Sequence, residues 1–178
     1  MYIWAMLHVL ETTRLQLRPC RRMDDAILLH TLCTNDRVRH FRFDNRTISL
    51  EEARSFVEDS GTNFAEYGYG LWLVFARVNI KRLVGFAGCL LSEAEIPSLI
   101  YGIHPDYWGH GYATEAADAV LKYMLETLNL PLVKADADEP NLASVRVLEK
   151  IGMVKKGNAV VNDKPLVYFE RSHPTIAI

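Results

Sequence analysis

Residues 105–116 read P-D-Y-W-G-H-G-Y-A-T-E-A, and they join an apolar strand to a long amphipathic helix. The strand is predicted at Ser98–Ile103 and the helix from about Tyr112 to Asn129. Glycines at 109 and 111 permit turns that point successive backbone amides inward, and the first helical turn adds unpaired donors and the positive end of the helix dipole. Such a junction can bind a pyrophosphate, and it is equally consistent with a simple tight turn.

Two other phosphate-binding motifs fit this junction poorly. A Walker-type loop needs Lys followed by Ser or Thr after its last glycine, where this chain has Tyr112 and Ala113. A Rossmann fingerprint needs a third glycine where Thr114 stands, and it usually opens the first βα unit of its domain. A dinucleotide-dependent oxidoreductase therefore remains only a distant alternative.

The sequence before the junction predicts two helices and an antiparallel hairpin. Ser49 and Glu52 form a capping box at the start of the second helix, which we expect to end near Gly61. The polar turn Asn79–Lys81 is expected to join two apolar strands. The predicted segments are a strand at 13–18, helices from Asp24 and Ser49, and strands at 71–77 and 82–91.

After the junction helix, the pattern predicts a strand at 132–137, a helix at 141–151 ended by Gly152, and a closing hairpin that includes 160–161 and 165–170. Strands joined by short turns pair antiparallel, whereas strands separated by a helix can pair in parallel. The expected fold is therefore of the α/β (α+β) class. It has a mixed, mainly antiparallel central sheet flanked by helices, with a parallel pair in the middle.

Length and composition predict one ordinary globular domain. The 178 residues carry 24% charged and 49% hydrophobic residues with a net charge of −2, so no nucleic-acid partner is expected. The apolar run at 1–10 is too short to cross a bilayer, so no membrane is expected either. We predict an N-terminal extension at 1–10 and one domain at 11–178. Three cysteines without a C-x-x-C pair predict a reducing, cytoplasmic location, and neither they nor the histidines indicate a metal site.

The 105–116 stretch resembles the acetyl-CoA loop of the GNAT superfamily of N-acetyltransferases, in the form typical of the RimJ/RimL-like branch that acetylates ribosomal-protein N-termini. A second block, N-L-A-S-V-R-V-L-E-K-I-G-M at 141–153, resembles the second cofactor helix of that family. The two blocks occur in the family's order with one strand between them. The resemblance implies the GNAT acyl-CoA N-acyltransferase fold, with acetyl-CoA as the donor substrate and a longer acyl-CoA left open.

The resemblance also assigns residues to the cofactor. It implies that the strand at 100–103 pairs through its backbone with the pantetheine arm, and that Asn141 hydrogen-bonds the same arm in addition to capping its helix. The backbone amides of the loop would hold the pyrophosphate. The implied cofactor-binding residues are Ile100, Tyr101, Gly102, Ile103, Gly109, His110, Gly111, Tyr112, Ala113, Thr114, Asn141 and Ser144.

Catalysis requires removal of a proton from an ammonium and a donor for the leaving thiolate. Many family members carry a tyrosine where this chain has Leu148. Ser144 is therefore the candidate proton donor, as in the RimL-like branch. The alternative is that Ser144 is only a small residue packed at the start of its helix. The branch often carries a glutamate where Ser98 stands. Asp136 is the candidate base, with Asp138, Glu93, Glu95 and a water relay left open.

The expected reaction is acetyl transfer from acetyl-CoA to a primary amine by direct attack, with a protein N-terminus or a small amine as acceptor. The departures at Leu148 and Ser98 leave a catalytically weak acyl-CoA-binding regulatory module as the alternative. The arginine-rich segment 37–46 either contacts the acceptor or is a solvated loop. A homodimer is also left open, because Tyr2 and Trp4 can either cover a partner subunit or pack on the domain.

Overall fold

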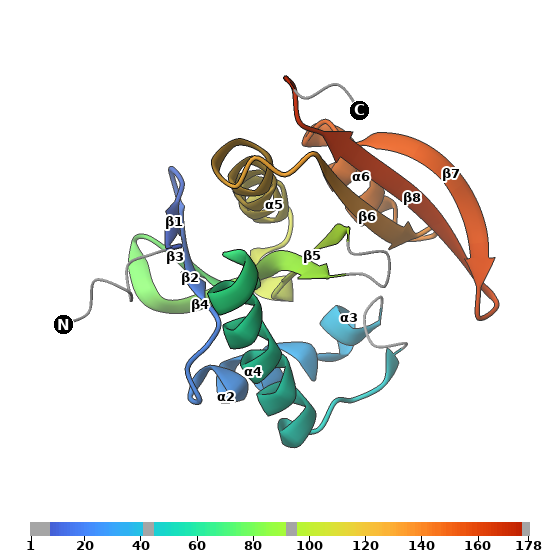
Figure 1. The fold of residues 1–178 in the computed structure, drawn as a ribbon. Helices are drawn as coiled ribbons and strands as arrows, with labels where there is room; N and C mark the ends of the chain where they lie inside the picture. The colour runs from blue at the N-terminus through green and yellow to red at the C-terminus, as the bar shows by residue number, and fades with distance from the viewer. Residues whose placement is uncertain (1–7, 41–44, 92–95, 176–178) are drawn as a thin grey trace.

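The structure is a computed structural model that describes residues 8–40, 45–91 and 96–175, which form a sheet with helices against both faces (Figure 1). The strands are β1 Leu10–Glu11, β2 Leu15–Pro19, β3 Leu71–Ala76, β4 Asn79–Leu91, β5 Pro97–Ile103, β6 Leu132–Asp138, β7 Val154–Val161 and β8 Lys164–Ser172. The helices are α2 Asp25–Cys33, α3 Asp36–Arg39, α4 Leu50–Tyr67, α5 Tyr112–Lys122 and α6 Leu142–Lys150. A short 3-10 turn, η2, covers Pro105–Tyr107, and a π turn, η3, covers Tyr123–Thr127.

The sheet is mixed and mainly antiparallel, as the sequence predicts. Its strand order is β1-β2-β3-β4-β5-β6-β8-β7, and β5 and β6 form the parallel pair near the middle. A parallel pair needs a long crossover, and α5 supplies it between β5 and β6. The predicted fold class and the position of the parallel pair are therefore confirmed.

Two hydrophobic clusters hold the layers together, one on each face of the sheet. α5 buries its apolar stripe against one face, where Val120, Leu121 and Met124 are fully enclosed. α2 and α4 pack on the other face, against alternate residues of β3 such as Leu73 and Phe75. Because neighbouring strand residues point to opposite faces, β3 is buried along its whole length. The sheet between these layers positions the loop that precedes α5.

α4 begins where the sequence predicts and ends later than expected. The capping box at Ser49 and Glu52 is present, with both reciprocal hydrogen bonds formed. The predicted end near Gly61 is wrong, because the helix continues to Tyr67 and is closed by Gly68 in the left-handed region with φ of 78°. A glycine inside a helix costs only about 1 kcal/mol, and the additional turns bury Phe64, which more than offsets that cost.

The hairpin between β3 and β4 turns two residues earlier than predicted. Ala76 pairs with Asn79, so Arg77 and Val78 form the turn, and the residues expected in the turn belong to β4. The polarity of Asn79–Lys81 suggested a loop, but an exposed strand end accommodates polar side chains equally well. Asn79 Oδ1 also accepts a hydrogen bond from the Lys81 amide at 3.1 Å, which satisfies that donor locally.

The helix after the junction keeps nearly its predicted extent, but its last turn is a π turn. The Leu128 amide donates to the Tyr123 carbonyl at 3.0 Å, and Asn129 lies at φ of 52° just beyond it. Tyr123 extends its hydroxyl to the Gly68 carbonyl at 2.8 Å, at the end of α4. A tertiary contact that no local pattern contains thus accompanies the change in helix type.

The first strand begins inside the segment predicted as an N-terminal extension. Leu10 pairs with Leu17, and the His8 carbonyl accepts a 2.6 Å hydrogen bond from Trp72 Nε1 in the core. Tyr2 and Trp4, considered above as dimer or packing residues, lie outside the described residues. No helix in the described ranges is long and apolar enough to cross a membrane.

Candidate active site

The loop between β5 and α5 is anchored at both of its ends. At its start, the His104 amide donates to the Val84 carbonyl at 2.8 Å, and the 3-10 turn η2 follows. Trp108 then folds back, and its indole Nε1 donates to the Ile103 carbonyl at 2.7 Å. The loop therefore leaves the strand in a fixed direction before it reaches its two glycines.

Both glycines have backbone angles that favour glycine. Gly109 and Gly111 each lie at φ of 77°, and Gly111 is the N-cap of α5. The helical hydrogen-bond ladder begins with the Glu115 amide, which donates to the Gly111 carbonyl at 3.1 Å. By helix geometry, the amides of residues 112–114 then remain as donors at the positive end of the dipole. This arrangement can hold an anion such as pyrophosphate.

The parallel strands β5 and β6 separate beyond Ser98. β5 pairs with β4 at seven positions, whereas its parallel pairing with β6 has one register pair, Ser98 with Lys134. Beyond Ser98, the edge of β5 at residues 100–103 has no ladder partner on that side among the described residues. An extended amide chain such as pantetheine can pair with an edge of this kind.

Ser144 lies beside this edge and is held from two directions. Its amide donates to Asn141 Oδ1 at 3.2 Å, so Asn141 is the N-cap of α6. The Tyr101 hydroxyl, from β5, lies 2.7 Å from Ser144 Oγ and 3.1 Å from the Ser144 carbonyl. Tyr101 was predicted only as a backbone contact. Its side chain follows from strand alternation, because it shares a face with Leu99 and Ile103, both in the α5-side cluster.

Leu148 has no part in proton transfer. It is 1% exposed and belongs to the cluster beneath α5 and α6. The position where many family members carry a tyrosine is therefore a core position here. Among the described residues, Ser144 and Tyr101 are the hydroxyl groups that meet beside this edge.

Asp136 lies on the opposite face of the sheet from Ser144. In β6 it alternates with Ala135 and Ala137, which are buried against the α5 side, so its exposed side chain points to the α2 and α4 side. It pairs in register with Tyr168 of β8. The structure thus brings Tyr101 and Ser144 into contact and places Asp136 across the sheet from them.

Two further groups of side chains are an aromatic pair in β8 and the arginine-rich segment. Phe169 is 1% exposed in the core, and its neighbour Tyr168 faces the other way, as alternation predicts. In the arginine-rich segment, Arg39 is bound by Asp36 and by the Asn45 carbonyl, and Arg46 pairs with Glu52 at 2.6 Å. These pairs match a charged surface loop. Residues 41–44 and the base candidates Glu93 and Glu95 lie outside the described residues.

Glu115, which lies in the 105–116 stretch but was assigned no role of its own, is strongly hydrogen-bonded near the loop. It accepts hydrogen bonds from Thr12 Oγ1 at 2.6 Å and from the Arg14 amide and Nε at 2.9 and 2.6 Å. Burial alone raises the pKa of this carboxyl, but these hydrogen bonds and the Arg14 charge outweigh it, so the pKa lies below its usual value. Glu115 is therefore ionised at neutral pH.

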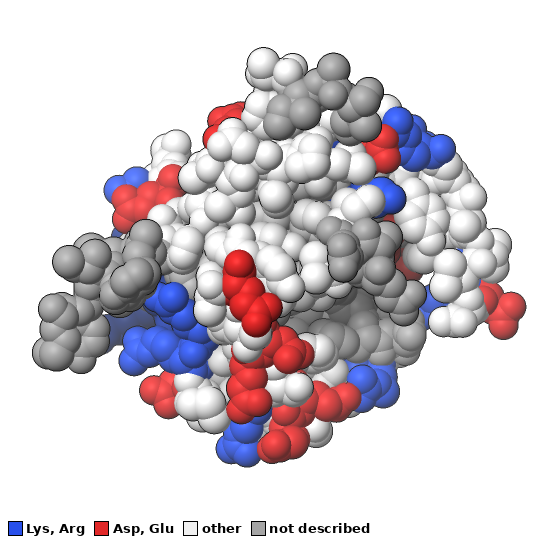
Figure 2. Space-filling view, viewed as in Figure 1, with Lys and Arg blue, Asp and Glu red and all other residues white. Residues whose placement is uncertain are grey.

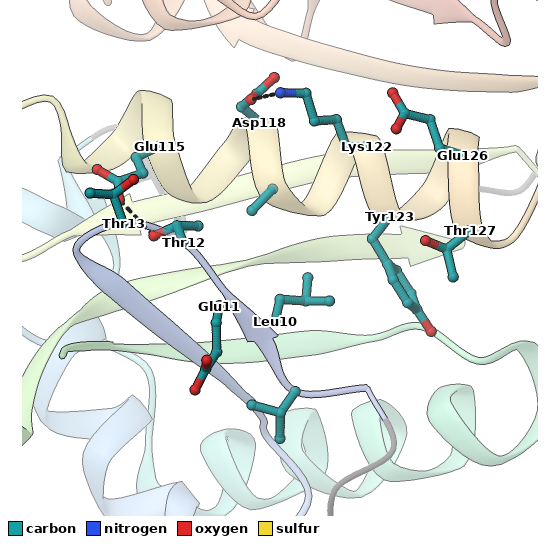
Figure 3. Close-up of a pocket in the computed structure, with 12 residues that line it drawn as sticks. Leu10, Glu11, Thr12, Thr13, Glu115, Asp118, Lys122, Tyr123, Glu126 and Thr127 are labelled. Atoms are coloured by element: carbon teal, nitrogen blue, oxygen red, sulfur yellow. Dashed lines mark hydrogen bonds and ion pairs between the residues drawn. The ribbon is translucent and has the colours of Figure 1, made fainter.

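A cavity of about 540 Å³ lies between the N-terminal strand segment and α5, and it reaches Glu115 in the first turn of that helix (Figure 3). Its lining includes Leu10, Thr12, Asp118, Lys122 and Tyr123. Asp118 and Lys122 form the i, i+4 ion pair expected from the sequence, at 2.7 Å. None of the predicted cofactor or catalytic residues lines it, so the loop and the β5 edge remain the candidate site.

Comparison with known proteins shows the family of the chain. Residues 14–154 match the family model described as an acetyltransferase (GNAT) domain. The chain belongs to the GNAT acetyltransferase family. It is therefore an acetyltransferase enzyme, and acetyl-CoA, the donor that this family uses, is its substrate.

The relatives extend over most of the chain. The N-acetyltransferase YoaA of Bacillus subtilis is 29% identical over 154 residues, which are 85% of this chain and 86% of YoaA. A GNAT acetyltransferase from Bacillus anthracis shares the fold with a TM-score of 0.76 and 23% identity, over 93% of this chain and 98% of that one. RimL, a ribosomal L7/L12 alpha-N-protein acetyltransferase solved with coenzyme A, has a TM-score of 0.77 at 16% identity, over 93% and 98% of the two chains. At such identities these two structures show a shared fold.

Proposed function

We propose that this GNAT enzyme transfers an acetyl group from acetyl-CoA directly to a primary amine, with the Tyr101 and Ser144 hydroxyls supplying the proton that the leaving thiolate needs. The observation that carries this proposal is the 2.7 Å contact between Tyr101 and Ser144 beside the unpaired edge of β5. The loop amides of residues 109–114 hold the pyrophosphate, residues 100–103 pair with the pantetheine arm, and the Asn141 side-chain amide donates to that arm.

The chemistry follows from which hydroxyl donates to which. When Tyr101 donates its proton to Ser144 Oγ, the Ser144 O–H is free to point at the sulfur. The amine nitrogen attacks the thioester carbonyl carbon, and the C–S bond breaks as the amide bond forms. The nitrogen releases its additional proton to solvent. Ser144 protonates the thiolate, Tyr101 passes its proton to Ser144, and solvent returns a proton to Tyr101.

The acceptor approaches from the face that carries α4. Asp136 points to this face and takes the proton from the acceptor ammonium, directly or through water. Figure 2 shows Asp and Glu side chains gathered over α4, whose exposed acids are Glu51, Glu58, Asp59 and Glu66. A negative surface attracts a cationic amine before it loses its proton. Both a protein N-terminus and a small amine have this charge, and the resemblance to the RimJ/RimL-like branch favours the N-terminus.

Further parts of the proposal concern the whole protein. We infer that residues 11–178 act as one catalytic domain. The three cysteines described in the structure are free thiols buried in the interior, which suits a reducing cytoplasm. A homodimer remains compatible with the fold.

An acceptor panel tests the reaction. Acetyl-CoA is incubated with N-terminal peptides, polyamines and amino sugars while free thiol release is followed. We expect release above the hydrolysis background with at least one class. If coenzyme A binds and no acceptor gives release, the regulatory acyl-CoA-binding module becomes the better interpretation.

Two pairs of variants test the assigned roles. Ser144→Ala should lower kcat by about 100-fold with little change in the KM for acetyl-CoA, the size expected for loss of a general acid, and Ser144→Thr should restore much of it. Asp136→Asn should reduce kcat/KM for the amine, whereas its neighbour Asp138→Asn should not. Full activity of Ser144→Ala would refute the proton-donor assignment.

A further inference from the structure

One arginine outside both cofactor blocks contacts the phosphate loop at several points. Arg14 precedes β2, about a hundred residues before the loop in the chain. Its Nη1 donates to the His110 carbonyl at 2.8 Å, and its guanidinium lies over the Tyr112 ring at 4.7 Å from the centroid. Its Nη2 lies 3.5 Å from the position that a Cβ on Gly111 would take.

The same guanidinium is fixed by Glu115 in the first turn of α5. Arg14 Nε and Nη2 both lie 2.6 Å from Glu115 Oε2, and the Arg14 amide and Thr12 Oγ1 bind Oε1. Figure 3 shows Glu115 and Thr12 facing one another at the start of α5. A planar guanidinium held by a carboxylate loses little freedom when it binds one more acceptor. Arg14 is therefore a rigid support for the loop.

Planarity of the peptide bond converts this contact into an orientation of the loop. The carbonyl of His110 and the amide N–H of Gly111 belong to one trans peptide unit, so they point in opposite directions. Because Arg14 draws the His110 carbonyl to one side, the Gly111 N–H is fixed toward the other side, away from the arginine. The Gly111 N–H is one of the donors assigned to the pyrophosphate.

Charge gives Arg14 a second effect. Glu115 is ionised and lies one turn from the amides that would receive the phosphates, so its negative charge alone opposes anion binding. The Arg14 guanidinium, in direct contact, compensates that charge. Removing Arg14 thus frees the loop peptide and exposes a carboxylate of the wrong sign.

We propose that Arg14 is a positioning residue for the acetyl donor, acting through the His110 carbonyl and Glu115 to orient the Gly111 amide toward the pyrophosphate. This inference rests on the proposed placement of the cofactor on the loop. It goes beyond that placement by assigning a role to a side chain from the N-terminal strand region. It also predicts that Arg14 affects the binding of ligands that carry a pyrophosphate and not of ligands that lack one.

Binding measurements on matched variants test the proposal. Arg14→Ala is compared with Arg77→Ala, because exposed Arg77 also donates to this N-terminal segment, at the Thr12 carbonyl, but does not contact the loop. We expect Arg14→Ala to raise the Kd for coenzyme A by roughly 10- to 100-fold, the effect of one lost charge-assisted hydrogen bond. Arg77→Ala should leave it unchanged. Arg14→Lys, which keeps the charge without the fork, should fall between the two.

Pantetheine, which lacks the pyrophosphate, tests whether Arg14 orients the loop for the pyrophosphate or has only a general structural role. Its binding, followed by ligand-observed NMR, should be the same in Arg14→Ala as in the parent chain. An equal loss for coenzyme A and pantetheine, or parental coenzyme A affinity in Arg14→Ala, would overturn the proposal. If Arg14→Ala fails to fold in a thermal melt, Arg14→Lys provides the same comparison. A parent chain that does not bind coenzyme A would instead refute the cofactor placement itself.

Discussion

Replacing Gly111 with alanine puts a Cβ atom on a residue whose φ is 77°. The new atom would lie 3.5 Å from Arg14 Nη2, an ordinary contact distance, so steric overlap with the protein is not the main effect. The strain comes from the backbone, since a side chain in the left-handed region costs roughly 1–2 kcal/mol. The loop can relieve that strain only by leaving the conformation that directs its amides toward the anion.

The strain sets the expected loss of affinity. If the full 1–2 kcal/mol of strain disfavours the binding conformation of the loop, the fraction of molecules in that conformation falls by about 5- to 30-fold. The Kd for coenzyme A then rises by the same factor. Gly111→Val should lose more, because a β-branched side chain tolerates positive φ even less. The stability of the fold should change little, because the buried face of α5 is untouched.

Calorimetric titration with coenzyme A, run beside thermal melts, measures both quantities. Gly109→Ala is the matched variant, since it has the same φ but its Cβ would meet nothing within 4 Å. Gly157→Ala in β7 is the neutral control, with no positive φ and open space around it. If Gly111→Ala binds coenzyme A as tightly as the parent, the loop is only a turn. A lowered melting temperature with unchanged affinity would lead to the same conclusion.

Three further predictions concern stability. Ser60→Ala should cost about 1–3 kcal/mol in urea denaturation, because it leaves the buried Leu71 amide, now 2.9 Å from Ser60 Oγ, without its acceptor. Ser49→Ala should cost about 1 kcal/mol through loss of the capping box, whereas exposed Ser55→Ala in the same helix should be near neutral in the same assay. The lowered pKa of Glu115 means that its stabilisation is complete above the unfolded-state pKa of about 4.3 and is lost as pH falls through the folded-state value. The free energy of unfolding, measured by denaturation between about pH 3 and about pH 7, should therefore fall less with acid in Glu115→Gln than in the parent. An identical fall would show that Glu115 does not contribute to the acid dependence.

Local patterns predicted the elements well and their ends less well. The capping box at Ser49 and the glycine after α6 depend on a few neighbouring residues, so the sequence contains all the information they need. The end of α4 does not, because burial of Phe64 by the opposite layer decides that the helix passes Gly61. The turn between β3 and β4 depends likewise on the register of two paired strands.

The sequence alone predicted the class of fold and the family, which are confirmed, and it located the loop to which we assign the phosphates. These features are local: two glycines at positive φ, a helix start beyond them, and a second block one strand later. Strand alternation also predicted that Tyr168 and Phe169 face opposite ways, and the structure shows that Phe169 is the one in the core. The periodicity of apolar residues and the spacing of motif residues reveal such features, because each feature depends on residues only a few positions apart.

The tertiary structure alone decided which side chains support the site. Tyr101 meets Ser144 across 43 positions, and Arg14 meets Glu115 across 101 positions. It also enclosed Leu148 in the core and placed Asp136 on the face opposite Ser144. Contacts of this kind arise only when the sheet order brings distant strands and helices together, and no local period encodes that order.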